Sequence, residues 1–310
     1  MNVLSLFDGI SCGRIALERA GINVDNYYAS EIDKYAMQIS QKNYPDIVQL
    51  GSVTEWKIWD LPKIDLLIGG SPCQGFSVSG GGFNFEDPRS KLFFEFENVL
   101  KSYQPRYFLL ENVNMKKEWK DTISEHLGVQ PVEINSALVS AQNRKRLYWT
   151  NIPSVTKPEN KHILLEDIID SGFVDRDKSY CLDANYYKGG SLDVLLRNYK
   201  EKKRRQIVLE ECVQVGEASE INGHDILKRV YSTKGKSPTL NSMGGGNREP
   251  KITEDNQTWR VLTPVECERL QTIPDGYTEG VSKTQRYKML GNGWTVDVIA
   301  HIFSFIPTEE

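Results

Sequence analysis

The sequence predicts an α/β protein with a doubly wound, mostly parallel sheet and a smaller, irregular domain. Three observations predict this fold: the chain opens with an apolar strand, a glycine turn and a helix; apolar runs then alternate with helical patterns; and residues 153–259 are more charged and less periodic. Alternating strands and helices are typical of a parallel sheet, whose ligands bind at the carboxyl ends of the strands. We expect a first domain at 1–153, a second at 154–258, and a segment at 259–310 that packs back on the first.

The composition excludes several classes of protein. The chain has 310 residues, of which 39% are hydrophobic and 26% charged, and no apolar stretch approaches the length of a membrane span. The N-terminus lacks the basic start of a signal peptide, so we expect a cytoplasmic protein. Five cysteines without a Cys-x-x-Cys pair argue against a disulfide framework and against a metal site. A net charge of −4 argues against a globally basic nucleic-acid binder but permits a local positive face.

The first element, a strand at 3–7, is followed by Asp8 and Gly9 and by a helix that Ser11 is expected to cap and Gly21 to end. Backbone amides at such a helix start can bind the carboxylate or phosphate of a nucleotide-like cofactor. The glycine spacing does not match the dinucleotide fingerprint, so an ordinary tight turn is an open alternative. A second strand at 26–30 ends at Glu31. In doubly wound folds the acid that binds a ribose diol lies about 20 residues after the first glycine turn, so the position of Glu31 favours a cofactor site.

A single cysteine, Cys73, follows the apolar run 65–68 in a loop rich in glycine and serine. A thiol at the end of a buried strand lies where a nucleophile meets its substrate, although most free cysteines are small buried hydrophobes. The loop at 74–89 mixes glycines with phenylalanines, which favours a lid that closes over a substrate above a plain surface connection. An amphipathic helix is predicted at 90–103.

The next strand, at 107–110, runs directly into Glu111. Adjacent strand ends would bring this carboxyl group close to Cys73 in a partly desolvated cleft, whereas a solvated strand-end acid is the common alternative. Arg144 and Arg146, two residues apart on extended backbone, point to one face. They could clamp a phosphate or a polar substrate edge, or simply form an exposed basic strand.

Beyond residue 153 the signals are weaker. The basic run at 202–205 and the glycine loop at 244–248 suit a surface that follows a nucleic-acid backbone, or a solvated face. Thr263 before Pro264 predicts the start of a helix. Residues 291–296 predict a glycine turn that opens a terminal helix, whose apolar face must pack on the first domain.

In their order along the chain, these pieces resemble the cytosine-C5 DNA methyltransferases of bacteria and phages over nearly the whole catalytic part. The motifs that carry the resemblance lie at residues 6–9, 71–77 (with Pro-Cys-Gln), 111–113 (Glu-Asn-Val), 142–146 (Gln-x-Arg-x-Arg), 260–266, 269–271 and 291–293. Residues 232–245 look like the end of a bacterial target-recognition region. Residues 3–31, 69–73 and 291–296 look closer to the vertebrate de novo branch.

The resemblance implies a Rossmann-like, S-adenosylmethionine-dependent fold and transfer of a methyl group to C5 of a flipped cytosine in double-stranded DNA. Cys73 would attack C6, Glu111 would hold N3 and the exocyclic amine, and Arg144 and Arg146 would bind the carbonyl edge. The implied cofactor-binding residues are Phe7, Asp8, Gly9, Ile10, Gly13, Glu31, Ile32, Ser52, Val53, Ser71, Pro72, Leu92, Asn292, Gly293 and Trp294. The implied DNA contacts are Gln74, Ser77, Ser79, Arg89, Thr239, Gly244 and Gly245.

Two positions depart from the family pattern. Ser52 stands where members often have an acid that contacts the adenine, and Ile32 stands where many bacterial members stack a tryptophan. Two alternatives are an RNA methyltransferase on the same fold and a catalytically silent DNA-binding module; the complete set of Cys73, Glu111 and both arginines argues against the second. The expected role is restriction-modification or self-protection of DNA, performed by a monomer.

Overall fold

A seven-stranded sheet forms the centre of the protein in the computed structural model, which describes residues 1–71, 91–186, 197–199, 201–209, 214–217, 229–232, 251–253 and 259–307. The strand order is β3-β2-β1-β4-β5-β7-β6, and only β7 runs antiparallel to its two neighbours. The strands are β1 (Asn2–Leu6), β2 (Asn26–Ser30), β3 (Val48–Gln49), β4 (Leu66–Gly69), β5 (Tyr107–Val113), β6 (Val132–Asn135) and β7 (Lys145–Thr150). The predicted doubly wound, mostly parallel sheet is confirmed.

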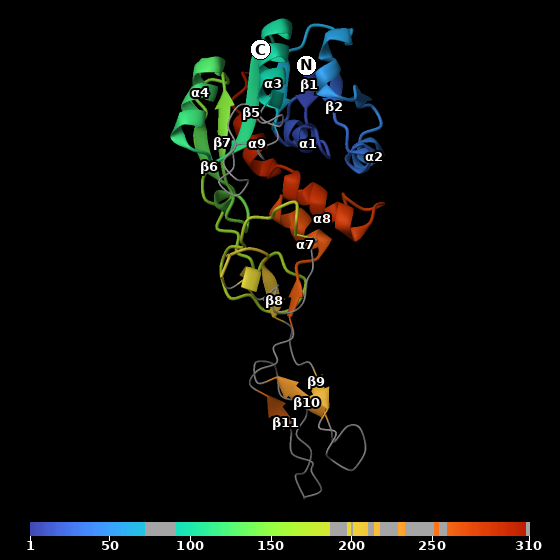
Figure 1. Cartoon of the computed structure of the whole chain (residues 1–310), viewed down its shortest axis with the longest axis vertical. Helices are drawn as coiled ribbons and strands as arrows, with labels where there is room; N and C mark the ends of the chain where they lie inside the picture. Colours follow the sequence, from blue (N-terminus) through green and yellow to red (C-terminus); the bar gives the residue numbers. More distant parts are fainter. Residues whose placement is uncertain are drawn as a thin grey trace, which may run out of the picture.

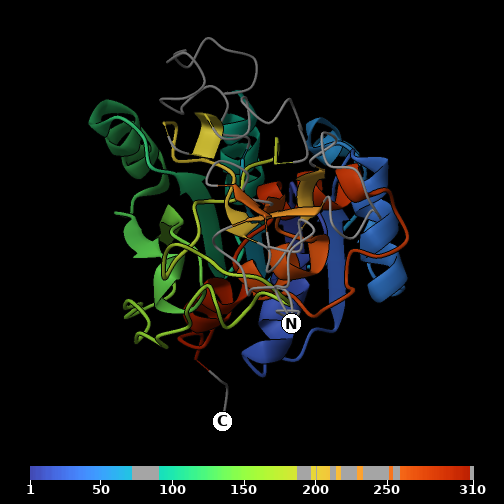
Figure 2. The ribbon, with the colours of Figure 1, turned by 90° about the horizontal axis from the view of Figure 1, so that it is seen from below.

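Helices cover both faces of this sheet. Successive residues of one strand, such as Leu66 and Leu67 of β4, belong to two different apolar clusters, one on each face. Because both faces are buried, the central strands are continuous apolar runs without polar alternation. One cluster takes in α1 (Cys12–Arg19), α2 (Lys34–Asn43) and α9 (Val296–Phe303), and the other takes in α3 (Lys91–Tyr103) and α4 (Lys117–Leu127). Figure 2 shows the green α4 and the blue α2 at opposite margins of the sheet.

Two small sheets lie apart from the large one. One has the order β11-β10-β9 and the other pairs β12 with β8. Figure 1 shows β9–β11 at the far end of the molecule, with β8, α7 (Pro264–Leu270) and α8 (Lys283–Asn292) between them and the large sheet. Their strands are β8 (Ile207–Leu209), β9 (Gln214–Glu217), β10 (Arg229–Ser232), β11 (Lys251–Thr253) and β12 (Trp259–Val261).

The C-terminal segment returns to the large sheet, as its apolar pattern predicts. The apolar side of α9 is fully buried in the cluster that also contains α1. An ion pair of 2.7 Å between Arg19 and Asp297 joins the two helices at the surface. The predicted start of α7 is also confirmed, because Thr263 and Glu266 form a capping box with Pro264 in the first turn.

The structure corrects three expectations from the sequence. Ser11 precedes α1 but does not cap it with its side chain, because its hydroxyl group binds Asp8 and Ser40 instead. Glu111 lies inside β5 and not after it, since this strand continues to Val113. Gly291 lies in the last turn of the unpredicted helix α8, which continues to Asn292, so the turn before α9 is shorter than expected. Among the described residues, no helix is both long and apolar enough to cross a membrane.

Candidate active site

A pocket of about 390 Å³ lies at the carboxyl ends of β1, β2, β4 and β5, where the strand order reverses between β1 and β4. This is the edge at which open α/β sheets bind ligands. The connection between α8 and α9 closes its opposite wall. Most of the residues predicted to bind a cofactor line the pocket, namely Phe7, Asp8, Gly9, Glu31, Ile32, Ser52, Val53, Ser71, Leu92, Asn292, Gly293 and Trp294.

The turn after β1 is strained. Phe7, Gly9 and Ser11 all have positive φ angles, of 58°, 62° and 60°. Such angles are rare for residues other than glycine and collect at functional sites. The turn is held by Asp8, whose carboxylate accepts hydrogen bonds from Ser11 Oγ at 2.5 Å and Tyr27 Oη at 2.8 Å. Burial raises the pKa of Asp8 to about 6, against the effect of these hydrogen bonds.

Two predicted cofactor residues, Ile10 and Gly13, do not line the pocket. Ile10 is buried in the core. A Cβ atom on Gly13 would lie 2.4 Å from Ile68 Cδ1 and 3.0 Å from Tyr27 Oη. Glycine at 13 therefore allows α1 to pack closely on the sheet, which places the start of the helix beneath the pocket.

Glu31 gathers the backbone around the pocket. One carboxylate oxygen accepts from Gly9 N at 2.8 Å, and the other accepts from the N–H groups of Ile32 and Asp33 at 2.7 and 2.8 Å. A carboxylate offers about four acceptor positions and three are filled, so Glu31 retains capacity for a hydroxyl group of a ligand. The side chain of Ile32 is 78% exposed at this wall, and Ser52 caps the short helix at Val53–Ile58.

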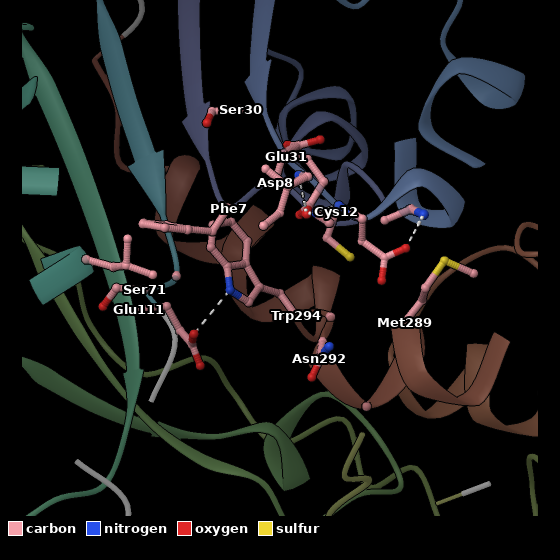
Figure 3. Close-up of a pocket in the computed structure, with 18 of the residues that line it drawn as sticks. Phe7, Asp8, Cys12, Ser30, Glu31, Ser71, Glu111, Met289, Asn292 and Trp294 are labelled. Atoms are coloured by element: carbon pink, nitrogen blue, oxygen red, sulfur yellow. Dashed lines mark hydrogen bonds between the residues drawn. The ribbon is translucent and has the colours of Figure 1, made fainter. Parts of the chain in front are cut away.

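Glu111 lies on the other side of the pocket, next to β4. Its two carboxylate oxygens have different partners: Arg146 Nε lies 3.0 Å from Oε1, and Trp294 Nε1 donates to Oε2 at 3.2 Å. Figure 3 shows the Trp294 ring between Phe7 and Glu111. Glu111 is only 8% exposed, and its ion pair with Arg146 offsets the cost of burying the carboxylate.

The strand that carries Glu111 also holds the end of the β4 segment. Asn112 Nδ2 donates to Ser71 Oγ at 3.1 Å, and Asn112 Oδ1 accepts from Val113 N. Ser71 is the last described residue before the segment with the candidate nucleophile. Nine predicted site residues lie outside the described residues: Pro72, Cys73, Gln74, Ser77, Ser79, Arg89, Thr239, Gly244 and Gly245.

Arg144 and Arg146 reach the same sulfur atom, Cys181 Sγ, at 3.5 and 3.8 Å, which agrees with their expected common side. Their main partners differ. Arg144 is 4% exposed and donates to the backbone oxygens of Leu182 and Gly293, each at 3.0 Å. Arg146 instead faces Glu111, so only the second arginine touches the acid.

Several pocket residues had no role in the sequence analysis, namely Cys12, Asp33, Gly70, Lys288 and Met289. Asp33 could have been found, because an aspartate just before a helical pattern is a typical N-cap. Cys12 gives no such signal, and burial raises its pKa to about 12, which keeps it a neutral thiol. Lys288 forms an ion pair of 2.7 Å with Asp33, which is distant in the sequence, so local patterns could not have predicted its position at the pocket. Across the described ranges, no group of His, Cys, Asp and Glu could hold a metal ion.

The protein is similar in fold and in sequence to known DNA methyltransferases. Among solved structures, a DNA modification methyltransferase encoded within an E. coli prophage superposes with a TM-score of 0.59 at 20% identity, over 98% of both chains. The fold is therefore that of the Rossmann-like methyltransferases. Type II methyltransferase M.NlaX of Neisseria lactamica is 30% identical over 97% of this chain and 94% of its own length. Orphan methyltransferase M.Rho11sI of Bacillus phage rho11s is 29% identical over 81% of this chain and 69% of its own length.

The family model for C-5 cytosine-specific DNA methylase matches residues 1–307. The chain belongs to this family and is a DNA methyltransferase specific for C5 of cytosine, as the resemblance implied. Family and fold imply S-adenosylmethionine-dependent chemistry with DNA as the substrate.

Proposed function

We propose that this protein transfers a methyl group from S-adenosylmethionine to C5 of a cytosine flipped out of double-stranded DNA. The observation that carries the proposal is the position of Glu111, a buried carboxylate held by Arg146 at the wall of a pocket whose far side contains Glu31. Glu111, which would bind the cytosine, and Glu31, which would bind the ribose of the donor, thus line the same pocket.

The pocket suits the methyl donor. Its volume of about 390 Å³ is within the range of small-ligand sites. Glu31 is oriented by three backbone N–H groups and can accept from a ribose hydroxyl group, while Ile32 offers an aliphatic surface to the adenine. Bound S-adenosylmethionine supplies an electrophilic methyl group. The protein positions that group and keeps water away from it.

Cys73 is the proposed nucleophile. Cytosine C5 is a poor nucleophile, and addition of the Cys73 thiolate at C6 forms a C–S bond that makes C5 electron-rich. Once C5 has taken the methyl group, S-adenosylhomocysteine is the leaving group. A solvent base then accepts the C5 proton, and elimination of the thiolate breaks the C–S bond and restores the ring. Two buried cysteines, Cys12 and Cys267, fit this role less well, because burial raises the pKa of both thiols.

Glu111 and Arg146 act on the base. Glu111 accepts from the exocyclic amine and exchanges a proton with N3 while charge develops on the ring. Arg146 holds the Glu111 carboxylate and the carbonyl edge of the base. Arg144, whose guanidinium binds the carbonyl oxygens of Leu182 and Gly293, serves the site by holding its far wall.

We propose that residues 154–258 form a recognition domain that binds duplex DNA. Residues 1–153 would form the catalytic domain, on which the segment at 259–310 packs. A base within a duplex is unreachable, so the segment after Cys73, with Gln74, Ser77, Ser79 and Arg89, is proposed to close behind the flipped nucleotide. Thr239, Gly244 and Gly245 are proposed to contact DNA. The names of the relatives, one type II and one orphan methyltransferase, support a role in restriction-modification or self-protection. We further propose that the protein acts as a cytoplasmic monomer in bacteria or phage-infected cells.

Incubation with tritiated S-adenosylmethionine and either DNA or RNA tests the proposal. We expect label in DNA; label in RNA alone, or in neither, contradicts it and points to an RNA enzyme or a silent binding module. Bisulfite sequencing of host DNA then reads the target site. Cys73→Ser should abolish transfer and preserve donor binding. DNA with 5-fluorocytosine in its target should form an adduct on Cys73, and an adduct on Cys12, Cys181, Cys212 or Cys267 would overturn the assignment.

A further inference from the structure

The Glu111 carboxylate is held on both oxygens by donors from distant parts of the chain. Arg146 Nε lies 3.0 Å from Oε1, and the indole Nε1 of Trp294 lies 3.2 Å from Oε2. The terminal torsion of a glutamate is broad, so a single donor leaves the carboxylate free to rotate about its last bond. Two donors, one on each oxygen, select one orientation. The remaining lone pairs then point in a defined direction.

The space for this contact is made by Gly70, the residue after β4. A Cβ atom at this position would lie 2.9 Å from Trp294 Nε1 and 3.1 Å from Glu111 Oε2. Any side chain at 70 would thus press on both partners of the hydrogen bond. The indole–carboxylate contact therefore requires glycine at position 70.

A buried polar network fixes the backbone on both sides of Trp294. The carbonyl oxygen of Gly293 accepts from Arg144 at 3.0 Å and from Gln271 Nε2 at 3.2 Å. The hydroxyl group of Thr295 donates to Gln271 Oε1 at 2.9 Å. Thr295 is buried and Trp294 is half-buried at the pocket wall. The anchored backbone fixes the point from which the indole extends, and the close approach of Gly70 restricts the ring itself, so its N–H group is held toward Glu111.

We propose that Trp294 is a positioning residue for Glu111: its indole N–H orients the carboxylate toward the cytosine, in addition to the contact that its ring makes with the donor pocket. This inference rests on the proposed function of Glu111. The competing interpretation is that the indole only fills space at the wall of the donor pocket, in which case its N–H group is dispensable. Trp294→Phe separates the two, because it retains an aromatic ring and removes the donor.

The chain offers a matched control. Trp56 Nε1 donates to Glu95 Oε2 at 2.9 Å, a second indole–carboxylate hydrogen bond whose two residues do not line the pocket. For Trp294→Phe we expect single-turnover methyl transfer to slow by about tenfold, with the donor dissociation constant changed by less than about threefold, because hydrogen bonds to charged groups are the strong ones. Trp56→Phe should leave both quantities near the wild-type values. A wild-type rate for Trp294→Phe, or a loss explained by weaker donor binding, would overturn the proposal.

A second measurement does not depend on activity. The six tryptophans of the chain give six indole N–H signals in a ¹H–¹⁵N spectrum, and the signal lost in Trp294→Phe, or in Trp294→Tyr as a second variant, belongs to Trp294. Glu111→Ala should move that signal and leave the Trp56 signal in place. An unmoved Trp294 signal contradicts the inference even if the protein methylates DNA. Absence of methylation by the wild-type protein would instead reject the proposed function, so the two failures are distinguishable.

Discussion

Asn112 Nδ2 lies 3.1 Å from Ser71 Oγ, and this buried contact joins the strand that carries Glu111 to the start of the segment that carries Cys73. β4 and β5 are adjacent and parallel, so the two strand ends leave the sheet side by side. The hydrogen bond sets where the next segment begins relative to the acid. The Glu-Asn-Val motif therefore contributes the proposed catalytic carboxylate and, one residue later, a contact that fixes the start of the segment with the proposed nucleophile.

Asn112→Asp tests that contact, because aspartate keeps the acceptor for Val113 N and loses the donor to Ser71. We expect single-turnover methyl transfer to fall about tenfold or more, since small misplacement of reacting groups is costly, with donor affinity nearly unchanged. Asn151→Asp is the matched control, because Asn151 also accepts from a backbone N–H group of β5, that of Phe108, and donates to an oxygen atom, that of Arg106, at the opposite end of the strand. Equal losses in the two variants would show a general effect on the strand.

The ion pair between Lys288 and Asp33 joins opposite walls of the pocket at 2.7 Å. Burial opposes ionisation of Asp33, but Lys288 and the backbone N–H groups of α2 outweigh it and lower its pKa. Asp33→Asn keeps the helix cap and loses the charge. We expect Asp33→Asn and Lys288→Met each to weaken donor binding about two- to fivefold at low salt and less at high salt, with no further loss in the double variant.

Calorimetric titration of the donor at two ionic strengths measures this effect. Lys161→Met removes an ion pair of similar length, to Asp297, from a site outside the pocket, and should leave donor binding unchanged. Additive losses in the double variant would mean that Asp33 and Lys288 act independently.

Asp8 should make stability depend on pH. Its pKa is raised to about 6 by burial, against 3.8 in an unfolded chain. Between these values the folded protein holds a proton that the unfolded chain has released, so the contribution of Asp8 to stability is present below about pH 4 and lost as pH rises through about 6. Asp8→Asn should therefore raise the free energy of unfolding at pH 7.5 by about 1–2 kcal/mol, since the residue is partly exposed. This corresponds to a melting temperature higher by about 2–6 °C, with little change at pH 4.

Thermal unfolding at the two pH values measures this difference. Asp121→Asn changes an exposed carboxylate and should shift the melting temperature little at either pH. A gain for Asp8→Asn that is equal at pH 4 and pH 7.5 would contradict the role of ionisation.

Gly291→Ala should destabilise the C-terminal segment strongly. A Cβ atom at 291 would lie 2.3 Å from the backbone C and O atoms of Asp183, which cannot move aside as a flexible side chain could. We expect a loss of about 3 kcal/mol or more in the free energy of unfolding, measured by urea denaturation. Gly128→Ala has open space and a positive φ of 69°, so it should cost only about 1–2 kcal/mol. A smaller loss at 291 than at 128 would contradict the steric argument.

Much of the fold could be predicted from local patterns. The strand at Asn26–Ser30, the end of α1 before Gly21, the capping box of α7 and the return of α9 all follow from short-range signals that the structure confirms. The helix α8 was missed because its sequence is mostly polar, with buried positions at Tyr287, Met289 and Leu290 near its end. Ser11 was misassigned because a cap position does not reveal whether the hydroxyl group has a better partner.

The sequence by itself determined which acids lie near the carboxyl ends of strands and which motifs follow one another, and hence the family. Tertiary structure decided how those groups are held. Arg144 and Arg146 look equivalent in sequence, but one binds the backbone of the far wall and the other pairs with Glu111. Trp294 reaches Glu111 across 183 positions of the chain. Such contacts depend on how separate elements pack, and residue type and spacing do not encode that packing locally.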